Sequence, residues 1–287
     1  MSIKLEDISY VYSPGTAYEQ HALKHISLEI PQGQFVGIIG HTGSGKSTLI
    51  QHFNGLMKAT SGKLYYEGKN IYEEGYDLKT LRSQVGLVFQ YPEHQLFETD
   101  VLSDVCFGPK NQGLSAAQCK ERAVEVLELV GLPEKYYDRS PFELSGGQKR
   151  RVAIAGILAM EPEYFILDEP TAGLDPVGKD QILRLLKKLH EEKKITIILV
   201  SHSMEDVAQY AQRIIVMNHG EIMYDGSPRE VFAHEGELYK AGLSLPFYCQ
   251  LAGELADRGF PVRRDLLTLK ETKEAILDIL RRKPDNA

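Results

Sequence analysis

The sequence predicts an α/β fold, in which short buried strands form a sheet that is covered by helices. A glycine-rich segment follows the apolar run at residues 34–39 and leads into a helix that opens at residues 48–53. Two further apolar runs, at residues 164–168 and 195–200, have the length of buried strands, and polar residues end or follow each of them. Open α/β sheets bind ligands beyond the carboxyl ends of their strands. The sequence therefore predicts a ligand site where these runs end.

The glycine-rich segment at residues 40–48 fits the phosphate-binding P-loop pattern G-x-x-x-x-G-K-[ST]. In such a loop the backbone N–H groups point at an anion, and the dipole of the following helix favours negative charge. We expect Lys46 to reach the β- and γ-phosphates and the Ser47 hydroxyl to take a place on Mg²⁺. A glycine-rich turn with a chance lysine is disfavoured, because the whole pattern is present after a strand. The candidate nucleotide-binding residues here are Gly40, His41, Thr42, Gly43, Ser44, Gly45, Lys46, Ser47 and Thr48.

Length and composition narrow the class of protein. The chain has 287 residues, which predicts one large domain or a domain with an appendage. No apolar run approaches the ~18 residues of a membrane span, and the first residues lack the apolar core of a signal peptide, so we expect a cytosolic protein. The net charge of −7 argues against nucleic acid as the main partner. The three cysteines lack the spacing of a disulfide framework or a zinc site.

The N-terminal part predicts a β layer beside the main sheet. Residues 2–12 and 23–30 read as strands, and residues 63–66 and 68–71 as two shorter ones. Tyr12 is a candidate to stack on an adenine ring, because nucleobase binding requires a flat aromatic face. An ordinary core or surface tyrosine is the alternative.

Residues 91–160 are mainly helical in pattern and predict a subdomain inserted between strands of the sheet. The strand before them, residues 85–89, ends in Gln90, a polar residue where ligands are expected. A capping box at residues 115–118 opens one helix, which Gly131 ends.

A second anion-binding element is suggested at residues 144–148, Leu-Ser-Gly-Gly-Gln, which precede a helix. A serine and two glycines at a helix start expose backbone N–H groups to an anion. Taken alone, a helix cap is the commoner explanation of this pattern.

The run at residues 164–168 ends in the adjacent carboxylates Asp168 and Glu169. In a P-loop protein Asp168 suits a place around Mg²⁺, and Glu169 can orient or deprotonate water. The P-loop upstream disfavours a mere acidic turn. The run at residues 195–200 leads to His202, which we interpret as a γ-phosphate contact because of its position at a strand end.

The remaining elements are a turn, a hairpin and a helical tail. Residues 171–176 predict a turn before a helix, and residues 213–224 a hairpin closed by Asn-His-Gly. The tail predicts a helix at residues 246–255 and a second one opened by a capping box at residues 268–271. The apolar stripe of this last helix can pack on its own domain or on a second subunit, and we favour the subunit.

With these residues in hand, the chain resembles the nucleotide-binding subunit of ATP-binding-cassette (ABC) transporters over about residues 1–230. Residues 40–47 resemble the Walker A loop, residues 144–148 match the LSGGQ signature, and residues 164–168 match Walker B. The resemblance implies an α/β P-loop NTPase (RecA-like) core with an antiparallel β subdomain and the inserted helical subdomain. The C-terminal extension would occupy residues 231–287.

The resemblance also implies roles for single residues. Gln90 corresponds to the Q-loop glutamine, which senses Mg²⁺ and the membrane subunit, and Asp175 belongs to a D-loop. The implied catalytic residues are Glu169, His202, Lys46 and Gln90, and the implied metal ligands are Ser47, Gln90 and Asp168. Nucleotide contacts beyond the P-loop are implied for Tyr12, Ser145, Gly146, Gly147, Gln148 and Asp175.

A narrower resemblance is to the ATPases of energy-coupling factor (ECF) transporters, most closely to the second of their two paralogues. Residues 88–97, residues 151–160 and the tail of about fifty residues carry it. It implies ATP and Mg²⁺ as cofactors and a head-to-tail dimer with a paralogue or with itself. It also implies a transmembrane scaffold, a solute-binding membrane subunit, and a peripheral place on the cytoplasmic face of the membrane. ATP hydrolysis would then power the uptake of vitamins or other micronutrients.

Two other functions share the catalytic motifs. One is the ATPase of an ordinary binding-protein-dependent importer, and the other is an ABC ATPase without a role in transport. Non-transport members usually carry two cassettes, long coiled coils or zinc insertions, none of which this sequence contains. The sequence does not name the solute.

Overall fold

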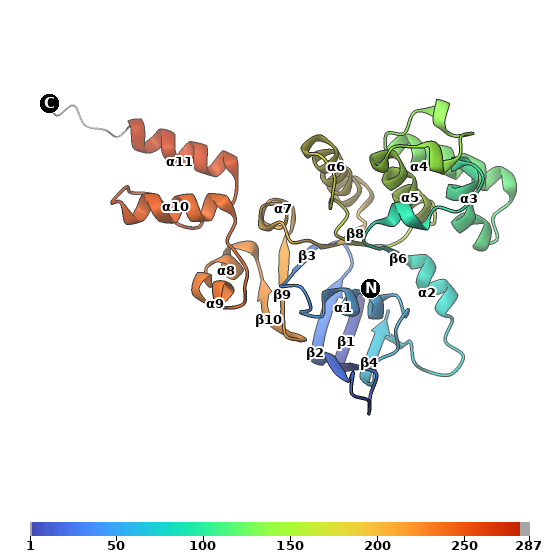
Figure 1. The fold of residues 1–287 in the computed structure, drawn as a ribbon, viewed down its shortest axis with the longest axis horizontal. Coiled ribbons are helices and arrows are strands. Elements are labelled where there is room, and N and C mark those ends of the chain that lie inside the picture. The colour runs from blue at the N-terminus through green and yellow to red at the C-terminus, as the bar shows by residue number, and fades with distance from the viewer. Residues whose placement is uncertain (1, 282–287) are drawn as a thin grey trace.

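The structure is a computed structural model that describes residues 2–281. A six-stranded sheet forms its centre, in the order β10-β9-β3-β8-β7-β6 (Figure 1). Every residue of β3, β7 and β8 is buried, which is why these stretches read as nearly continuous apolar runs. All the strands run parallel except β10, which pairs antiparallel with β9. The strands are β3 (Phe35–Ile39), β6 (Val85–Val88), β7 (Tyr164–Asp168), β8 (Thr196–Val200), β9 (Arg213–Asn218) and β10 (Glu221–Gly226).

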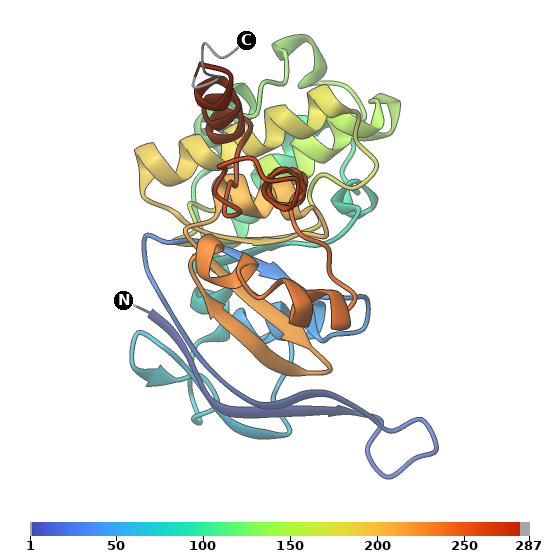
Figure 2. The ribbon, with the colours of Figure 1, turned by 90° about the vertical axis from the view of Figure 1, so that its left-hand side faces the viewer.

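A second, antiparallel sheet contains the N-terminal strands in the order β2-β1-β4-β5. The long strands β1 and β2 form its floor in Figure 2. The helix α1 (Lys46–Phe53) lies between the two sheets, because its Leu49, Ile50 and Phe53 share one buried cluster with residues of both. The predicted β layer is confirmed. Its strands are β1 (Ser2–Tyr12), β2 (Gln20–Pro31), β4 (Ser61–Tyr66) and β5 (Lys69–Asn70).

The other face of the central sheet is covered by α5 (Gly146–Leu158), α6 (Pro176–Lys193) and α7 (Met204–Tyr210), which contribute to a second buried cluster. The turn and helix predicted around residues 171–176 are confirmed by α6. A short helix, α2 (Leu78–Gln84), precedes β6 and has no counterpart among the predicted elements.

The helical subdomain, green in Figure 1, lies at the β6 end of the sheet. The capping box at residues 115–118 is present as predicted: Ser115 accepts from the Gln118 N–H and Gln118 accepts from the Ser115 N–H. The elements are α3 (Val101–Asn111), α4 (Ala116–Leu129), α5 (Gly146–Leu158) and the 3₁₀ turns η1 (Pro92–Gln95), η2 (Glu134–Tyr136) and η3 (Pro141–Glu143).

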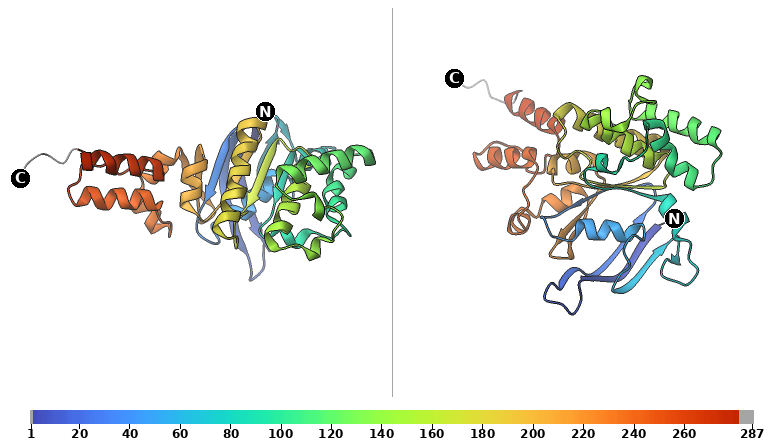
Figure 3. Two further views of the ribbon diagram at one scale, coloured as in Figure 1. Left: turned by 90° about the horizontal axis from the view of Figure 1, so that it is seen from above. Right: turned by 45° about the vertical axis from the view of Figure 1, so that its right-hand side comes forward.

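The chain continues into α8 (Pro228–Phe232), α9 (Glu235–Lys240), α10 (Phe247–Asp257) and α11 (Leu269–Arg281). The expected boundary after residue 230 falls inside α8, whose Val231 and Phe232 belong to the main core. The helices α10 and α11 lie side by side and project from the body (Figures 1 and 3). Residues 282–287 of the expected extension lie outside the described part of the chain.

The capping box predicted at residues 268–271 forms only in part. The Thr268 hydroxyl accepts from the Glu271 N–H, as expected. The Glu271 carboxylate, however, accepts from the Leu267 N–H and pairs with Arg229 of α8. Arg229 also pairs with Asp265, so one arginine ties α8 to the segment that leads into α11. No helix within residues 2–281 combines the length and the apolar character that a membrane crossing requires.

Candidate active site

The P-loop joins β3 to α1 at the carboxyl edge of the central sheet. Its glycines are required by space and by backbone geometry. A Cβ on Gly40 would lie 2.4 Å from the Met217 carbonyl oxygen, and one on Gly45, whose φ is 104°, would lie 2.6 Å from the Ala22 carbonyl oxygen. The Gly220 N–H donates to the Ser44 carbonyl at 3.0 Å, so the β9–β10 hairpin is part of the wall behind the loop.

Lys46 lies at the centre of this loop and is buried. Its Nζ donates to the carbonyl oxygens of Gly40 at 2.7 Å and His41 at 2.9 Å. Burial lowers the pKa of the Lys46 ammonium, and the charges of Glu169 and Asp168 act in the opposite direction. An ammonium held inside a ring of backbone groups is suited to bind phosphate oxygens.

The Ser47 hydroxyl donates to Asp168 Oδ2 at 2.8 Å, which brings the end of β7 to the start of α1. A hydroxyl and a carboxylate are oxygen ligands of the kind Mg²⁺ takes, usually with phosphates and water in its other positions. Within residues 2–281 no group of three or more His, Cys, Asp or Glu side chains forms a protein-only metal site. The donor set therefore fits a magnesium ion that is bound partly by these two side chains and partly by a nucleotide.

Glu169 follows directly and has a left-handed backbone, with φ of 50°. Its N–H donates to the Val200 carbonyl at 3.0 Å, which anchors it beside the end of β8. Its Oε1 is buried and has no hydrogen-bond partner among the described residues. Burial, followed by the neighbouring Asp168, raises the pKa of Glu169 to about 7. A buried carboxylate oxygen without a partner, in a group of this pKa, is suited to accept a proton from water.

His202 follows β8 at the same edge, and its Nε2 lies 3.4 Å from Glu169 Oε1. The contact does not satisfy the geometry of a hydrogen bond. Burial, followed by the charge of Lys46, lowers the pKa of His202. The histidine side chain remains about half exposed and is therefore accessible to a ligand.

Tyr12 ends β1 next to the P-loop. Its hydroxyl is 3.1 Å from the Thr48 hydroxyl, and the ring stands edge-on to Tyr10 at a centroid distance of 4.8 Å. A small cavity of about 130 Å³ opens between Tyr12, Gln20 and the loop residues that include Gly43 and Lys46. The structure thus brings Tyr12 together with the P-loop, Asp168, Glu169 and His202.

The signature residues do not lie beside the P-loop but at the N-terminus of α5. Ser145 caps the N-terminus of α5, and Gln148 closes a reciprocal capping box with it. Within the described residues, no hydrogen bond joins residues 145–148 to the P-loop of the same chain. Asp175 caps α6 by accepting from the Gly178 N–H at 2.6 Å. Gln90 is exposed and lies two residues after the end of β6.

Three residues near the site were not among the predicted site residues. His219, in the hairpin turn, has its ring centroid 4.9 Å from that of His41. Arg150 and Glu93 form a buried ion pair close to the loop that follows Glu169. All three are separated in sequence from the residues they contact, so these contacts could not be predicted from a local motif.

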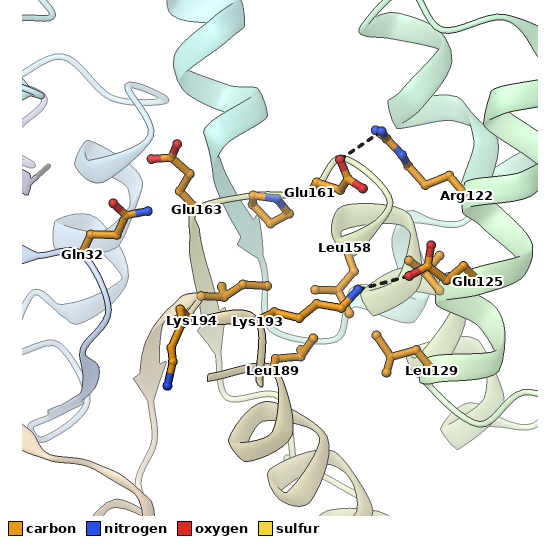
Figure 4. Close-up of a pocket in the computed structure, with 13 residues that line it drawn as sticks. Gln32, Arg122, Glu125, Leu129, Leu158, Glu161, Glu163, Leu189, Lys193 and Lys194 are labelled. Carbon is orange, nitrogen blue, oxygen red and sulfur yellow. Dashed lines mark hydrogen bonds and ion pairs between the residues drawn. The ribbon is translucent and has the colours of Figure 1, made fainter. Parts of the chain in front are cut away.

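A larger pocket of about 300 Å³ lies at the opposite, amino-terminal edge of the sheet, between α4 and the end of α6 (Figure 4). Two ion pairs border it, Arg122 with Glu161 at 3.0 Å and Lys193 with Glu125 at 3.2 Å. None of the P-loop or strand-end residues lines it. The candidate catalytic and phosphate-binding residues therefore lie at the carboxyl edge, although the cavity at that edge is the smaller of the two.

Comparison with known proteins agrees with this geometry. Residues 23–172 match the family of ABC transporters. The energy-coupling factor transporter ATP-binding protein EcfA2 of Caldanaerobacter subterraneus subsp. tengcongensis is 57% identical over 281 residues, 98% of each chain. Its counterpart of the same name from Clostridium perfringens is 52% identical over 98% of this chain and 99% of that protein.

Two solved structures extend the likeness to three dimensions. The cbiO1 protein from Clostridium perfringens, part of the ABC transporter complex cbiONQ, superposes with a TM-score of 0.73 at 41% identity, over 89% of this chain and 98% of that one. The dimeric post-hydrolysis state of the ATP-binding cassette MJ0796, bound to ADP and Pi, gives a TM-score of 0.72 at 33% identity over 79% and 99%. The P-loop NTPase fold expected from the sequence is confirmed. The chain belongs to the ABC transporter family and, within it, to the energy-coupling factor transporter ATP-binding proteins.

Proposed function

We propose that this chain binds ATP with Mg²⁺ and hydrolyses it at the cytoplasmic face of the membrane, and thereby powers an ECF-type importer of vitamins or other micronutrients. The observation that carries the proposal is the convergence of Lys46, Ser47, Asp168 and Glu169 at one edge of the sheet. Lys46 and Ser47 come from the P-loop, whereas Asp168 and Glu169 come from the end of β7 and the residue that follows it.

In the proposed reaction, Lys46 and the backbone N–H groups of the loop hold the β- and γ-phosphates. Ser47 and Asp168 would hold Mg²⁺, with Gln90 as a further ligand, and the ion would supply positive charge beside the phosphate oxygens. Glu169 orients the attacking water and accepts its proton at Oε1. His202 contacts the γ-phosphate, and Tyr12 stacks on the adenine.

The signature residues are proposed to act on a second subunit. The N-terminus of α5, with Ser145, Gly146, Gly147 and Gln148, is exposed or half-exposed and lies apart from the P-loop of its own chain. In a head-to-tail dimer with a paralogue or with itself, this terminus would complete the partner's site, and Asp175 would lie at the interface. ATP would then hold the dimer closed.

The C-terminal helices are proposed to add to that subunit contact. The helices α10 and α11 pack on each other, and several of their apolar side chains remain exposed. Exposed apolar side chains on a projecting helix pair are consistent with a subunit contact. The exposed residues are Phe247, Leu269, Leu277 and Leu280.

A transmembrane scaffold subunit is proposed to dock in a groove of about 260 Å³ between η1, α3 and α5. Phe97 and Phe107 stand at its rim, about half exposed, with ring centroids 4.9 Å apart. The floor is formed by Ala153, Gly156 and Ile157 of α5. We expect an apolar segment of the scaffold to bind in this groove, whose lining residues Pro92 and Gln95 follow Gln90 in the chain.

The experiment that tests the proposal is a tagged pull-down from detergent-solubilised membranes of the host, with companions identified by mass spectrometry. We expect a second, different cassette ATPase, a small transmembrane scaffold and several solute-binding membrane proteins. Recovery of one permease pair with an extracytoplasmic binding protein would instead assign an ordinary importer. Recovery of ribosomes or DNA would overturn the role in transport and leave only the ATPase chemistry.

A further inference from the structure

Arg150 lies in the second turn of α5 and is almost completely buried, with 2% of its surface exposed. Its guanidinium makes four hydrogen bonds. Nε and Nη2 donate to the two carboxylate oxygens of Glu93, at 3.1 and 2.7 Å. Nη1 donates to the carbonyl oxygens of Pro170 at 3.2 Å and Ala172 at 2.5 Å. One buried side chain therefore joins three segments of the chain.

The carboxylate end of this link belongs to η1. Glu93 is three residues beyond Gln90, and its neighbours Pro92 and Gln95 line the groove between η1, α3 and α5. The Glu93 side chain is 15% exposed, so it is largely withdrawn from water. Burial acts to raise the pKa of Glu93, but the hydrogen bonds and charge of Arg150 outweigh it, and the pKa lies below its ordinary value. The pair is therefore ionised at neutral pH.

On its other side, Arg150 binds carbonyl oxygens of the loop that follows Glu169. This loop begins with the left-handed backbone of Glu169 and turns back through a bond from the Ala172 N–H to the Glu169 carbonyl at 3.1 Å. Within residues 2–281, the carbonyl oxygens of Pro170 and Ala172 accept hydrogen bonds only from Arg150. A non-glycine residue keeps a left-handed backbone only where its surroundings hold it. Arg150 supplies part of that restraint from outside the loop.

We infer that Arg150 is a positioning residue for ATP hydrolysis, which fixes the loop that carries Glu169 and ties its position to η1 through Glu93. A displacement of η1 is thereby transmitted to the Glu169 carboxylate. It passes through the two hydrogen bonds from Arg150 to Glu93 and the two from Arg150 to the carbonyl oxygens of Pro170 and Ala172. The further statement that a membrane subunit produces this displacement rests on the proposed function.

Only arginine has the geometry for this link. Its planar guanidinium presents five donors in a fixed fork, so it binds a carboxylate with two of them while others remain directed at carbonyl oxygens. A lysine ammonium keeps the charge but cannot make both sets of contacts in the same plane. Arg150→Lys therefore separates the charge of this residue from its geometry.

The test on the isolated protein measures kcat and KM for ATP in Arg150→Lys, in Glu93→Gln and in the charge-swapped Arg150→Glu/Glu93→Arg double variant. We expect kcat to fall of the order of 10- to 100-fold in Arg150→Lys, because small misplacements of a reacting group have effects of this size. Glu93→Gln should lower kcat less, and KM should stay within about twofold in both. The double variant should remain slow, since a carboxylate at position 150 cannot donate to the carbonyl oxygens of the loop.

Hydrogen exchange adds a readout that general destabilisation does not reproduce. In both single variants we expect exchange at residues 169–175 to rise more than exchange in the P-loop. The matched control is Arg151→Lys on the same helix, whose guanidinium binds the Val130 carbonyl and Gln181 instead, and which should keep kcat within about twofold. A wild-type kcat in folded Arg150→Lys, or an equal rise of exchange throughout the chain in Glu93→Gln, would overturn the inference.

The dependence on a membrane subunit is measured separately, in the complex recovered by the pull-down. We expect the assembled scaffold to change the kcat of the wild type, and this response to be reduced at least threefold in Glu93→Gln although the scaffold still co-purifies. An undiminished response in Glu93→Gln would contradict the transmitted displacement. Absence of any scaffold from the wild-type sample would instead contradict the proposed function and leave the result on the isolated protein standing.

Discussion

The Ser47 hydroxyl donates to Asp168 Oδ2 at 2.8 Å, across a separation of 121 residues in the sequence. The bond brings a hydroxyl from the P-loop into contact with a carboxylate from the end of β7. Since both are ligands that magnesium accepts, their contact marks the position where we expect the ion to bind.

The first prediction concerns this pair. Asp168→Asn should lower Mg²⁺-dependent ATP hydrolysis by at least 100-fold, because the variant loses the one negative charge in direct contact with Ser47. Ser47→Thr is the control and should retain activity within about threefold, since it keeps the hydroxyl. The measurement is a magnesium titration of the hydrolysis rate. Equal magnesium dependence in Asp168→Asn and the wild type would show that the ion is bound elsewhere.

The second prediction separates binding from chemistry. Glu169→Gln should bind ATP within a few-fold of the wild type but hydrolyse it about 10²–10⁴-fold more slowly, because the amide oxygen is a poor proton acceptor. Single-turnover hydrolysis and equilibrium binding measure the two effects. With ATP, the variant should also accumulate as a dimer in size-exclusion chromatography. Hydrolysis near the wild-type rate would remove Glu169 from its proposed role.

The third prediction uses Gly156, at which an added Cβ has no heavy atom within 4 Å. Gly156 lies on the floor of the proposed docking groove, so Gly156→Leu should fill the groove and abolish co-purification of the scaffold. The isolated variant should hydrolyse ATP within about twofold of the wild type. Gly156→Ala should dock normally and be more stable by ~1 kcal/mol, since alanine favours the helix. Full co-purification with Gly156→Leu would rule out this groove as the docking surface.

The fourth prediction concerns stability and pH. Because Arg150 lowers the pKa of Glu93 in the folded state, the ion pair stabilises the fold above the ordinary glutamate pKa of 4.5, and its contribution is lost as the pH falls further. Glu93→Gln should therefore destabilise the protein by about 2–4 kcal/mol at pH 7, and by progressively less below pH 4.5. The measurement is denaturant unfolding across this range.

A matched control for the pH series is Glu161→Gln. Glu161 also pairs with an arginine, at 3.0 Å, but it is 65% exposed, and exposed pairs contribute little. Its substitution should change stability by less than ~1 kcal/mol at any pH. A loss in Glu93→Gln that is the same at pH 7 and at low pH would show that packing, not charge, is responsible.

Much of the fold could be predicted because its signals are local. The buried strands are short apolar runs, and the P-loop is a contiguous motif whose conformation is set by its own glycines. The strand ends then place Asp168 and His202 at the same edge, since parallel strands share their carboxyl edge. The catalytic and binding roles of these residues remain predictions that the variants above test.

What sequence patterns missed depends on tertiary contacts. The helix α2 has Leu81 as its one buried residue, so it has no apolar stripe that predicts a helix. Arg150 follows a lysine and precedes another arginine, and nothing in this basic run indicates that Arg150 is buried against Glu93, 57 residues earlier. The Glu271 carboxylate was expected to close a local cap, but Arg229 from α8 and the Leu267 N–H bind it instead. Such pairings follow only from the folded chain.

The helix α5 contains residues of the signature, the buried Arg150 and part of the proposed docking groove. It spans 13 residues, which corresponds to a rod of about 20 Å. Its first turn contains Gly146, Gly147 and Gln148 of the signature, its second turn contains Arg150, and its last two turns line the groove. On this arrangement, a lineage that exchanges one membrane partner for another needs to vary only the last two turns and the facing aromatic residues. The chemistry at the other end of the same helix can then stay unaltered while the docking surface adapts to a new scaffold.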